Sequence, residues 1–109
     1  MIQFSQENGS RLIVYLFGEI DHHSAQSLRI QIESMIHRTQ AKHLTLDFSN
    51  VSFMDSSGVG MIIGRYRTMS SAGGLMSARG LHSTVERLFR MAGLHRIIAI
   101  EEIQEEKRA

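Results

Sequence analysis

The chain of 109 residues contains neither cysteine nor proline. The absence of cysteine excludes disulfides, thiolate catalysis and cysteine-ligated zinc, and it suits a reducing cytoplasm. The absence of proline indicates short helices and strands without internal breaks, because proline interrupts both. The ends of the helices must then rest on glycine, serine and aspartate, which cap helix termini well.

The sequence also lacks long apolar runs and an excess of charge of either sign. Its apolar runs, such as residues 97–100, are far shorter than the roughly 20 residues that cross a bilayer. Residues 1–7 have neither the basic start nor the apolar centre of a signal peptide. The 12 lysines and arginines are balanced by 11 acidic residues, whereas a nucleic-acid-binding protein normally carries a clear basic excess. We therefore expect one soluble cytoplasmic domain over residues 1–109, with a charged tail over about 101–109.

Hydrophobic periodicity predicts strands and helices in the order β-β-α-β-α-β-α-β. Asn8-Gly9 is a strong hairpin signal between the first two strands, because both positions tolerate a positive φ. The second strand is a nearly continuous apolar run, so we expect it to be buried on both faces. Strands that alternate with helices indicate an α/β fold with parallel pairs and right-handed crossovers, and the opening hairpin makes the predicted sheet mixed. The predicted strands are 2–7, 11–17, 43–48 with an apolar extension to 54, 75–79 and 97–100.

Capping residues mark the starts of three predicted helices. The first is expected to begin at a Ser24 cap and to end near Thr39. The second follows the polar cluster 55–58 and closes at the glycine pair 73–74. The third begins at a capping box over 83–86, in which a serine hydroxyl and a glutamate satisfy each other's backbone donors. Its buried stripe is expected to include Val85, Leu88, Phe89 and Ala92, with Gly93 as its end.

The segment 53–60, Phe-Met-Asp-Ser-Ser-Gly-Val-Gly, is the most informative, because it lies where a predicted strand turns into a helix. The first backbone N–H groups of a helix lack partners within the helix and form the positive end of its dipole. A phosphate placed there meets ready donors. A simpler interpretation is that Asp55, Ser56 or Ser57 only caps the helix. The residues alone leave both interpretations open.

Known catalytic and nucleotide-binding motifs fit this segment poorly. Residues 58–60 resemble the start of a dinucleotide-binding loop, but Ile63 occupies the position of the third glycine. No Gly-Lys-Ser/Thr sequence occurs, and the hydrolase elbow needs a glycine where this chain has Met54. We interpret Gly60 and Gly64 as small residues that let the helix lie close to the sheet.

The sequence Asp21-His22-His23 makes a poor metal site. Adjacent histidines at the start of a helix point in different directions, and the sequence offers no second cluster of ligands. We expect instead an exposed segment that leads into a helix, in which the Asp21 carboxylate accepts hydrogen bonds from backbone N–H groups. The sequence therefore implies no metal in this chain.

Three segments resemble the STAS domain of the anti-sigma factor antagonist family, in the right order over nearly the whole chain. They are 18–23 (Gly-Glu-Ile-Asp-His-His), 51–60 with its continuation 63–66, and 87–94. The first segment is most similar to the sporulation branch of the family, which acts in the sigma F pathway. The resemblance implies a single STAS domain that works as a regulator and not as an enzyme.

The family also implies a mechanism for this chain. The first serine of the family's Asp-Ser-Ser-Gly motif, here Ser56, is the phosphoacceptor. The anti-sigma factor is an ATP-dependent serine kinase that modifies it. The unphosphorylated antagonist binds that kinase and frees the sigma factor, here for sporulation transcription, and a metal-dependent serine/threonine phosphatase restores this form. ATP and metal belong to those partners, so no cofactor is expected in this chain, and the sigma factor is only an indirect partner.

We expect the partner to bind around Ser56, on a surface that reaches Asp21 if the second and third strands are neighbours. Met54 and Ile62 offer either apolar contact or core, and the core is the expected place for Ile62. Two other functions stay open: a STAS antagonist in a general-stress sigma pathway, and a nucleotide-binding module that uses the turn at 56–64 directly. The proposed interface residues are Asp21, Asp55, Ser57, Gly58, Val59 and Met61.

Overall fold

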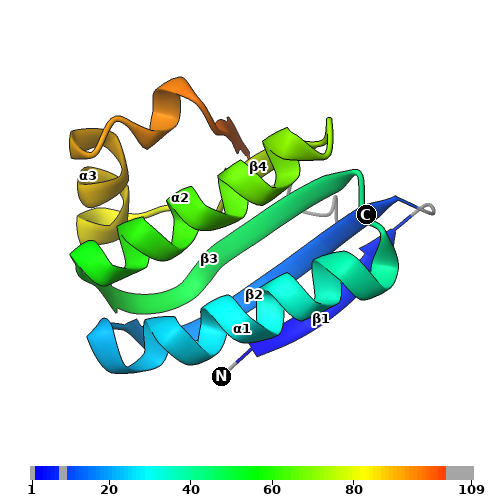
Figure 1. Cartoon of the computed structure of the whole chain (residues 1–109). Coiled ribbons are helices and arrows are strands. Elements are labelled where there is room, and N and C mark those ends of the chain that lie inside the picture. The colour runs from blue at the N-terminus through cyan, green and yellow to red at the C-terminus, as the bar shows by residue number, and fades with distance from the viewer. Residues whose placement is uncertain (1, 8–9, 103–109) are drawn as a thin grey trace, which may run out of the picture.

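The computed structural model describes residues 2–7 and 10–102, and its helices and strands follow the predicted order (Figure 1). A short 3₁₀ helix, η1, is added before the last strand. The predicted charged tail falls almost entirely outside the described residues. The elements are β1 (Ile2–Glu7), β2 (Arg11–Ile20), α1 (His22–Thr39), β3 (His43–Met54), α2 (Ser56–Ser71), β4 (Leu75–Arg79), α3 (Ser83–Met91), η1 (Leu94–Arg96) and β5 (Ala99–Glu101).

The strands form one mixed sheet in the order β1-β2-β3-β4-β5. β1 and β2 form an antiparallel pair, and every later pair is parallel. The predicted hairpin and mixed sheet are therefore confirmed. In Figure 1, α1 and α2 lie side by side against one face of this sheet. Because β2 and β3 are parallel neighbours, the turns that follow them lie at the same edge of the sheet.

The core lies between that face and the two helices. Alternate side chains of β2 and β3, such as Leu12 and Leu44, are fully buried there. Leu28 and Ile32 of α1 and Ile62 of α2 meet them from the other side. Ile62 is therefore a core residue, as expected.

The opposite face of the sheet also carries buried side chains. Ile13, Thr45 and Asp47 are at most 5% exposed, although they alternate with the core residues along β2 and β3. The burial of Ile13 next to Leu12 confirms that β2 is buried on both faces in this stretch. Two of these three buried side chains are polar, so they need partners on this face.

β2 and β3 are longer than predicted. Gly18 does not end β2: it has a φ of +83° and adjoins a shift in the register between β2 and β3, so it forms a bulge inside the strand. β2 continues to Ile20, and β3 continues to Met54. Ile20 and Met54 are a register pair, so the two strands end together.

The starts of α1 and α3 also differ from the prediction. Asp21 is the N-cap of α1, and Ser24 is the third residue of the helix. In α3, Ser83 is itself the first helical residue, with a φ of +50°, and the N-cap His82 makes no side-chain capping bond. The predicted capping box is therefore wrong. A serine hydroxyl can act at the cap or within the first turn, so the sequence pattern does not fix its register.

The last predicted strand begins too early. Gly93 has a φ of +77° and leads into η1, so the chain makes another turn before β5 begins at Ala99 and ends at Glu101. In α3, Val85 and Phe89 are buried as expected, whereas Ala92 is exposed.

Candidate functional site

Ser56 is the first residue of α2 and follows the end of β3 after a single residue. That residue, Asp55, has an extended backbone (φ −113°, ψ −170°) and is the N-cap of the helix. Its carboxylate accepts a hydrogen bond from the backbone N–H of Ser57, with 2.8 Å between oxygen and nitrogen. Asp55 thus performs the capping, and the side chain of Ser56 is left exposed.

Asp21 occupies the equivalent place at the start of α1. Its carboxylate accepts a hydrogen bond from the backbone N–H of Ser24 at 2.9 Å, and the Ser24 hydroxyl accepts one from the backbone N–H of Asp21 at 3.0 Å. The bond from the Ser24 backbone lowers the pKa of Asp21 below its ordinary value. Asp21 therefore satisfies backbone donors, as expected, and presents a carboxylate that stays charged.

The starts of α1 and α2 lie next to each other. Ile20 pairs with Met54 at the ends of β2 and β3, and the backbone N–H of Asp55 donates a hydrogen bond to the carbonyl of Ile20 at 3.1 Å. The strands are neighbours, which was the condition for Asp21 to reach the Ser56 turn. Two capping carboxylates and an exposed serine therefore share one edge of the sheet.

A hollow of about 300 Å³ opens between the first turns of α1 and α2. His22 and Arg29 line it from α1, and Ser57 and Met61 line it from α2. Met61 is only 3% exposed, so it contributes a small apolar area at the base of the hollow. A group that enters here meets a guanidinium, an imidazole and an apolar base within reach of the Ser56 turn.

Gly58 is buried because α2 lies close to the end of β3 at this point. A Cβ atom on Gly58 would overlap Cγ of Met54 and lie 2.8 Å from its Sδ. By contrast, a Cβ built on Gly60 or Gly64 would meet nothing within 4 Å beyond the adjoining backbone of its own helix, so their interpretation as close-packing glycines is wrong. Met54 is a buried core residue, and Val59 is half-buried.

An ion pair that no local sequence pattern indicated ties α1 to α2. Arg65 of α2 is 6% exposed, and its Nε lies 2.8 Å from the carboxylate of Glu33 on α1. The hydroxyl of Thr68 donates to the same carboxylate at 3.0 Å. These contacts hold together the two helices whose first turns form the candidate site.

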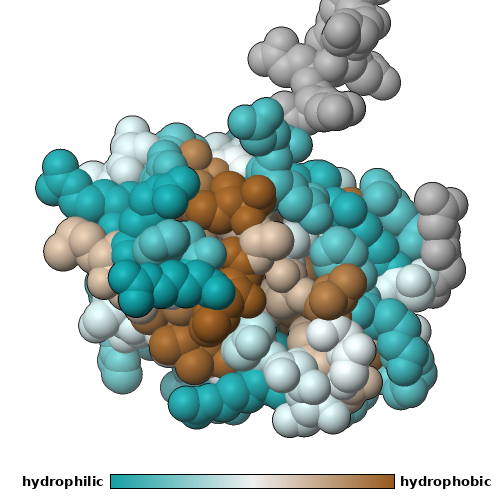
Figure 2. All heavy atoms as spheres, turned by 90° about the horizontal axis from the view of Figure 1, so that it is seen from above, coloured by the Kyte–Doolittle hydropathy of each residue, from teal (hydrophilic) through white to brown (hydrophobic). Residues whose placement is uncertain are grey.

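An apolar surface lies near the same end of the molecule. Figure 1 places the start of α2 and the helix α3 at one end, and Figure 2 shows apolar side chains gathered on the face above them. Met91 of α3 is 77% exposed, and Ile97 after η1 is 46% exposed. The surface of α3 and of the segment after η1 is therefore partly apolar.

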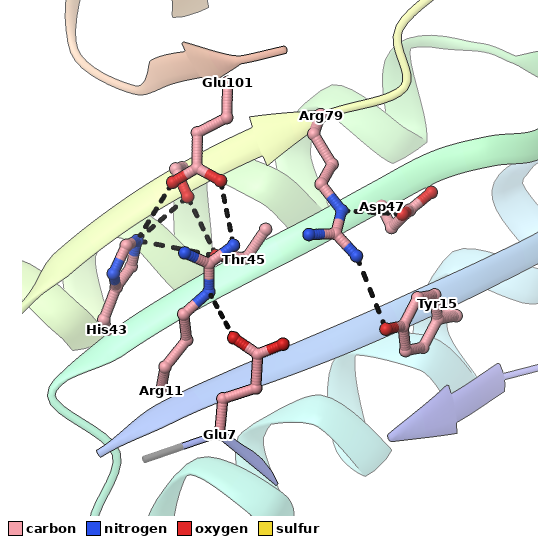
Figure 3. Close-up of polar contacts among 9 residues, drawn as sticks. Glu7, Arg11, Tyr15, His43, Thr45, Asp47, Arg79 and Glu101 are labelled. Carbon is pink, nitrogen blue, oxygen red and sulfur yellow. Dashed lines mark hydrogen bonds and ion pairs between the residues drawn. The ribbon is translucent and has the colours of Figure 1, made fainter. Parts of the chain in front are cut away.

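A polar cluster lies on the face of the sheet away from α1 and α2 (Figure 3). Arg79 donates from Nε to the carboxylate of Asp47 at 2.8 Å and from Nη2 to the hydroxyl of Tyr15 at 3.4 Å. Burial alone would raise the pKa of Asp47, but hydrogen bonds from Arg79 and from the Ser49 backbone outweigh it and lower the pKa below its ordinary value. These bonds explain how a polar residue is buried on this face.

His43 belongs to the same cluster, at the start of β3. Its Nε2 lies 2.9 Å from the Ser77 hydroxyl and 3.6 Å from the carboxylate of Glu101, which also accepts a hydrogen bond from Arg11 at 2.9 Å (Figure 3). Burial and the charge of Arg11 lower the pKa of His43, although Glu101 opposes them. The cluster is distinct from the Ser56 turn, because β3 begins at His43 and ends next to that turn.

Among residues 2–7 and 10–102, no group of three or more histidines, cysteines, aspartates or glutamates is placed to hold a metal ion. None of the helices in this part of the chain is long and apolar enough to cross a membrane. What the structure does present at the start of α2 is an exposed hydroxyl beside two capping carboxylates.

A model of the STAS domain matches residues 2–107. The anti-sigma F factor antagonist of Paenibacillus polymyxa is 44% identical over 89 residues, which cover 82% of this chain and 76% of that protein. The chain belongs to the STAS domain family, among the anti-sigma factor antagonists. The family resemblance of its sequence segments is thereby confirmed.

This STAS domain is also similar to the anti-sigma-B factor antagonist of Bacillus subtilis (strain 168), with 33% identity over 95 residues, 87% of this chain and 85% of that protein. The structure of the anti-sigma factor antagonist SpoIIAA in its unphosphorylated form matches with a TM-score of 0.83 and 30% identity, over 96% of this chain and 90% of that one. SpoIIAA in its phosphorylated form matches with a TM-score of 0.76 and 28% identity, over 96% and 93%. The predicted fold is confirmed by these matches.

Proposed function

We propose that this STAS domain is a phosphorylation-controlled antagonist whose switch is Ser56. Its unphosphorylated form binds an anti-sigma factor that is also a serine kinase, and this binding releases the sigma factor. Phosphorylation of Ser56 by that kinase ends the binding. The observation that carries the proposal is the exposed Ser56 hydroxyl at the first position of α2, in a chain similar to SpoIIAA, which exists in unphosphorylated and phosphorylated forms.

The geometry favours Ser56 over Ser57 as the phosphoacceptor. Ser56 is exposed, whereas Ser57 is half-buried and lines the hollow between α1 and α2. The backbone N–H of Ser57 is held by the Asp55 carboxylate, which fixes the residue in the first turn. A kinase needs access to the acceptor hydroxyl, and Ser56 is the more exposed of the two serines.

The proposed docking surface surrounds Ser56. Asp21 and Asp55 supply charge, Ser57 and Met61 line the hollow, and Gly58 and Val59 continue the first turns of α2. A phosphoserine adds about −1.5 to −2 charges at neutral pH. Beside Asp55, that group meets like charge, and it must lose water when it enters an interface. The modification therefore weakens docking through local electrostatics.

The sigma F circuit is the proposed setting. The Paenibacillus polymyxa relative, an anti-sigma F factor antagonist, shares 44% of its aligned residues with this chain. In this setting the chain is a cytoplasmic regulator of sporulation transcription and not an enzyme. Its kinase uses ATP, and a separate metal-dependent phosphatase returns the protein to the unphosphorylated form. The second candidate is a general-stress circuit, which the similarity to the Bacillus subtilis anti-sigma-B factor antagonist supports.

One experiment tests the phosphoacceptor and the circuit together. The purified chain is incubated with ATP and, separately, with an anti-sigma F and an anti-sigma B kinase, and its peptides are analysed by mass spectrometry. We expect phosphate on Ser56 with the sigma F kinase, none in Ser56→Ala, and phosphate again on Ser56 in Ser57→Ala. Ser57→Ala is the matched control because the cap uses the backbone of Ser57 and not its hydroxyl. Labelling of Ser56→Ala would overturn the assignment, and labelling by the sigma B kinase alone would move the chain to the stress circuit.

A further inference from the structure

Two hollows lie along the line where α1 and α2 meet, one near each end of the helices. The helices run side by side in the same direction (Figure 1). The first hollow, of about 300 Å³, opens beside the Ser56 turn. The second, of about 510 Å³, lies between the last turns of the two helices, and its lining includes His37, Lys42 and Arg67. We call the surface that joins the two hollows the α1–α2 seam.

The seam carries positive side chains that no described acidic residue neutralises. Arg29 lines the first hollow, Lys42 and Arg67 line the second, and all three are exposed. Within residues 2–7 and 10–102, no aspartate or glutamate lines either hollow, and none of the three cations forms an ion pair. Asp21 and Asp55 stand at the end of the seam nearest Ser56, where each carboxylate caps its own helix. The rest of the seam is therefore positively charged.

The one acidic side chain between the two hollows is already engaged. The carboxylate of Glu33 lies 2.8 Å from Nε of Arg65 and 3.2 Å from Nε2 of His37, and it accepts a hydrogen bond from the Thr68 hydroxyl at 3.0 Å. Nη1 of Arg65 is buried and has no acceptor among the described residues. Because buried donors are normally paired, the middle of the seam holds more donors than acceptors. The whole seam thus favours an anionic occupant.

We propose that an acidic segment of the anti-sigma factor kinase lies along the α1–α2 seam, with carboxylates at Arg29 in the first hollow and at Lys42 and Arg67 in the second. The inference rests on the proposed function, because it takes this kinase as the protein that docks at Ser56. The part of α1 from Arg29 to Thr39 is about 15 Å long. A segment of about five extended residues spans that distance.

The seam is continuous with the proposed docking surface. Ser57 and Met61 belong to that surface and also line the first hollow. A kinase bound at the Ser56 turn therefore reaches the seam within one interface. Arginine binds carboxylates with two parallel hydrogen bonds, and complementary charge guides association and fixes its register.

The lining of the seam fits a protein segment better than a nucleic acid or a membrane. Proteins that bind nucleic acids usually add aromatic side chains to a broad basic surface. In the described part of the chain, no phenylalanine or tyrosine lines either hollow, and the net charge of the chain is only +1. A membrane surface requires exposed apolar side chains, whereas Met61 and Ile36 at the base of the two hollows are 3% and 6% exposed.

Cross-linking tests the contact directly, because the chain has only two lysines, Lys42 and Lys107. A water-soluble carbodiimide activates a carboxylate, and an amine in contact with it then forms an amide, while the carbodiimide takes up the elements of water and leaves as a urea. In the isolated complex with the kinase, we expect mass spectrometry to find Lys42 joined to an aspartate or glutamate of the kinase. The complex of Lys42→Arg should lack this product. A wild-type complex without it would overturn the proposal.

Three further variants locate the acidic segment without changing the charge of the chain. Arg29→Lys and Arg67→Lys place new amines in the two hollows, and each should add a cross-link to the kinase. Arg38→Lys is the matched control, because Arg38 is exposed on the last turn of α1 but lines neither hollow of the seam. The yields are compared per amount of isolated complex. An equal yield from all three variants would overturn the proposed location.

Charge reversal measures how much the seam contributes to binding. Arg29→Glu and Arg67→Glu should each weaken the dissociation constant of the kinase at least about tenfold in calorimetry, and Arg38→Glu less than about threefold. The difference should shrink in about 1 M salt, where charges are screened over about 3 Å. Circular dichroism checks that the variants are folded. Equal effects of the three substitutions would show that only net charge acts, and the proposal would be wrong.

The remaining outcomes separate this inference from the proposed function. A wild-type chain that does not bind the kinase would overturn the proposed function and this inference with it. A wild-type chain that binds, with Arg29→Glu and Arg67→Glu binding equally well, would overturn this inference alone. Titrations with inorganic phosphate and with a labelled DNA duplex cover the other anions. If the two variants lost affinity only for one of these probes, the seam would serve that anion and not the kinase.

Discussion

The backbone N–H of Asp55 donates a hydrogen bond to the carbonyl of Ile20, and this bond of 3.1 Å joins the starts of two helices. The residues after the two strands are both aspartates with almost the same backbone angles, φ −116° and ψ −173° at Asp21 and φ −113° and ψ −170° at Asp55. Each carboxylate caps its own helix. The proposed docking surface is thus built by repeating one local structure on neighbouring strands.

Replacement of Asp55 tests the cap. Asp55→Ala should lower the free energy of unfolding by about 1 kcal/mol, because the first turn of α2 loses the acceptor of the Ser57 N–H. Asp55→Asn should lower the free energy of unfolding much less, because asparagine is an equally good cap. Urea unfolding of the three proteins measures the difference. If alanine and asparagine had the same effect, the carboxylate oxygen would not be acting as a cap.

Phosphorylation of Ser56 should weaken docking and leave the fold intact. The first position of a helix tolerates a phosphate, because the free N–H groups and the dipole favour negative charge there. If the phosphorylated form binds the kinase less favourably than the unmodified form by roughly 3 kcal/mol, its affinity is more than a hundredfold weaker. Calorimetry with the kinase measures the loss, and circular dichroism of the phosphorylated chain should match that of the unmodified one. A phosphoprotein without native circular dichroism would contradict this account.

The order of elements could be predicted because it depends on local periodicity. The strand at 75–79 and the end of the first helix near Thr39 agree with β4 and α1. The errors occur where one residue type serves two purposes. Ser24 and Ser83 were assigned as caps, but serine is equally suited to the first turn, and Gly18 forms a bulge where a stop was expected.

The position of Ser56 between a strand and a helix followed from the sequence, but the contacts around it did not. The pair Glu33–Arg65 joins two helices across 32 positions of the chain, and neither residue has a local pattern that names its partner. The close approach of α2 was assigned to Gly60 and Gly64, whereas it occurs at Gly58. Which glycine meets Met54 depends on where α2 begins relative to the end of β3, and that is a tertiary property.

The glycines of α2 give a matched pair of alanine substitutions. Gly58→Ala should destabilise the protein by about 1–3 kcal/mol, because its Cβ would overlap the buried side chain of Met54. Gly60→Ala should stabilise it by about 0.4–1 kcal/mol, because the new Cβ meets open space and the unfolded chain loses freedom. Thermal or urea unfolding measures both. Equal effects of the two substitutions would show that α2 does not approach β3 as described.

Asp47 should make the protein sensitive to strong acid. Its pKa is lowered in the folded state, because hydrogen bonds from Arg79 and Ser49 outweigh the effect of burial. Its contribution to stability is therefore fully present above the ordinary pKa of 3.8 and is lost as the pH falls through the lowered folded value. Asp47→Asn should be less stable than wild type at neutral pH and should lose less stability between pH 5 and pH 2, roughly the range over which such a carboxylate titrates. Equal acid dependence of the two proteins would contradict the Arg79 pair.

His43 should change the stability of the protein in a higher range of pH than Asp47 does. Burial and the nearby charge of Arg11 lower its folded pKa below the ordinary 6.5, against the opposing effect of Glu101. As the pH falls from 6.5 toward the folded pKa, the unfolded chain binds a proton that the folded chain resists, so stability decreases through this range. His43→Gln should remove that decrease from urea-unfolding data. Arg11→Gln, which removes the repelling charge, should raise the pKa of His43 in an NMR titration of its imidazole. A His43 resonance that titrates above 6.5 in the wild-type protein, or an unchanged value in Arg11→Gln, would show that the cluster on this face does not control the charge of His43.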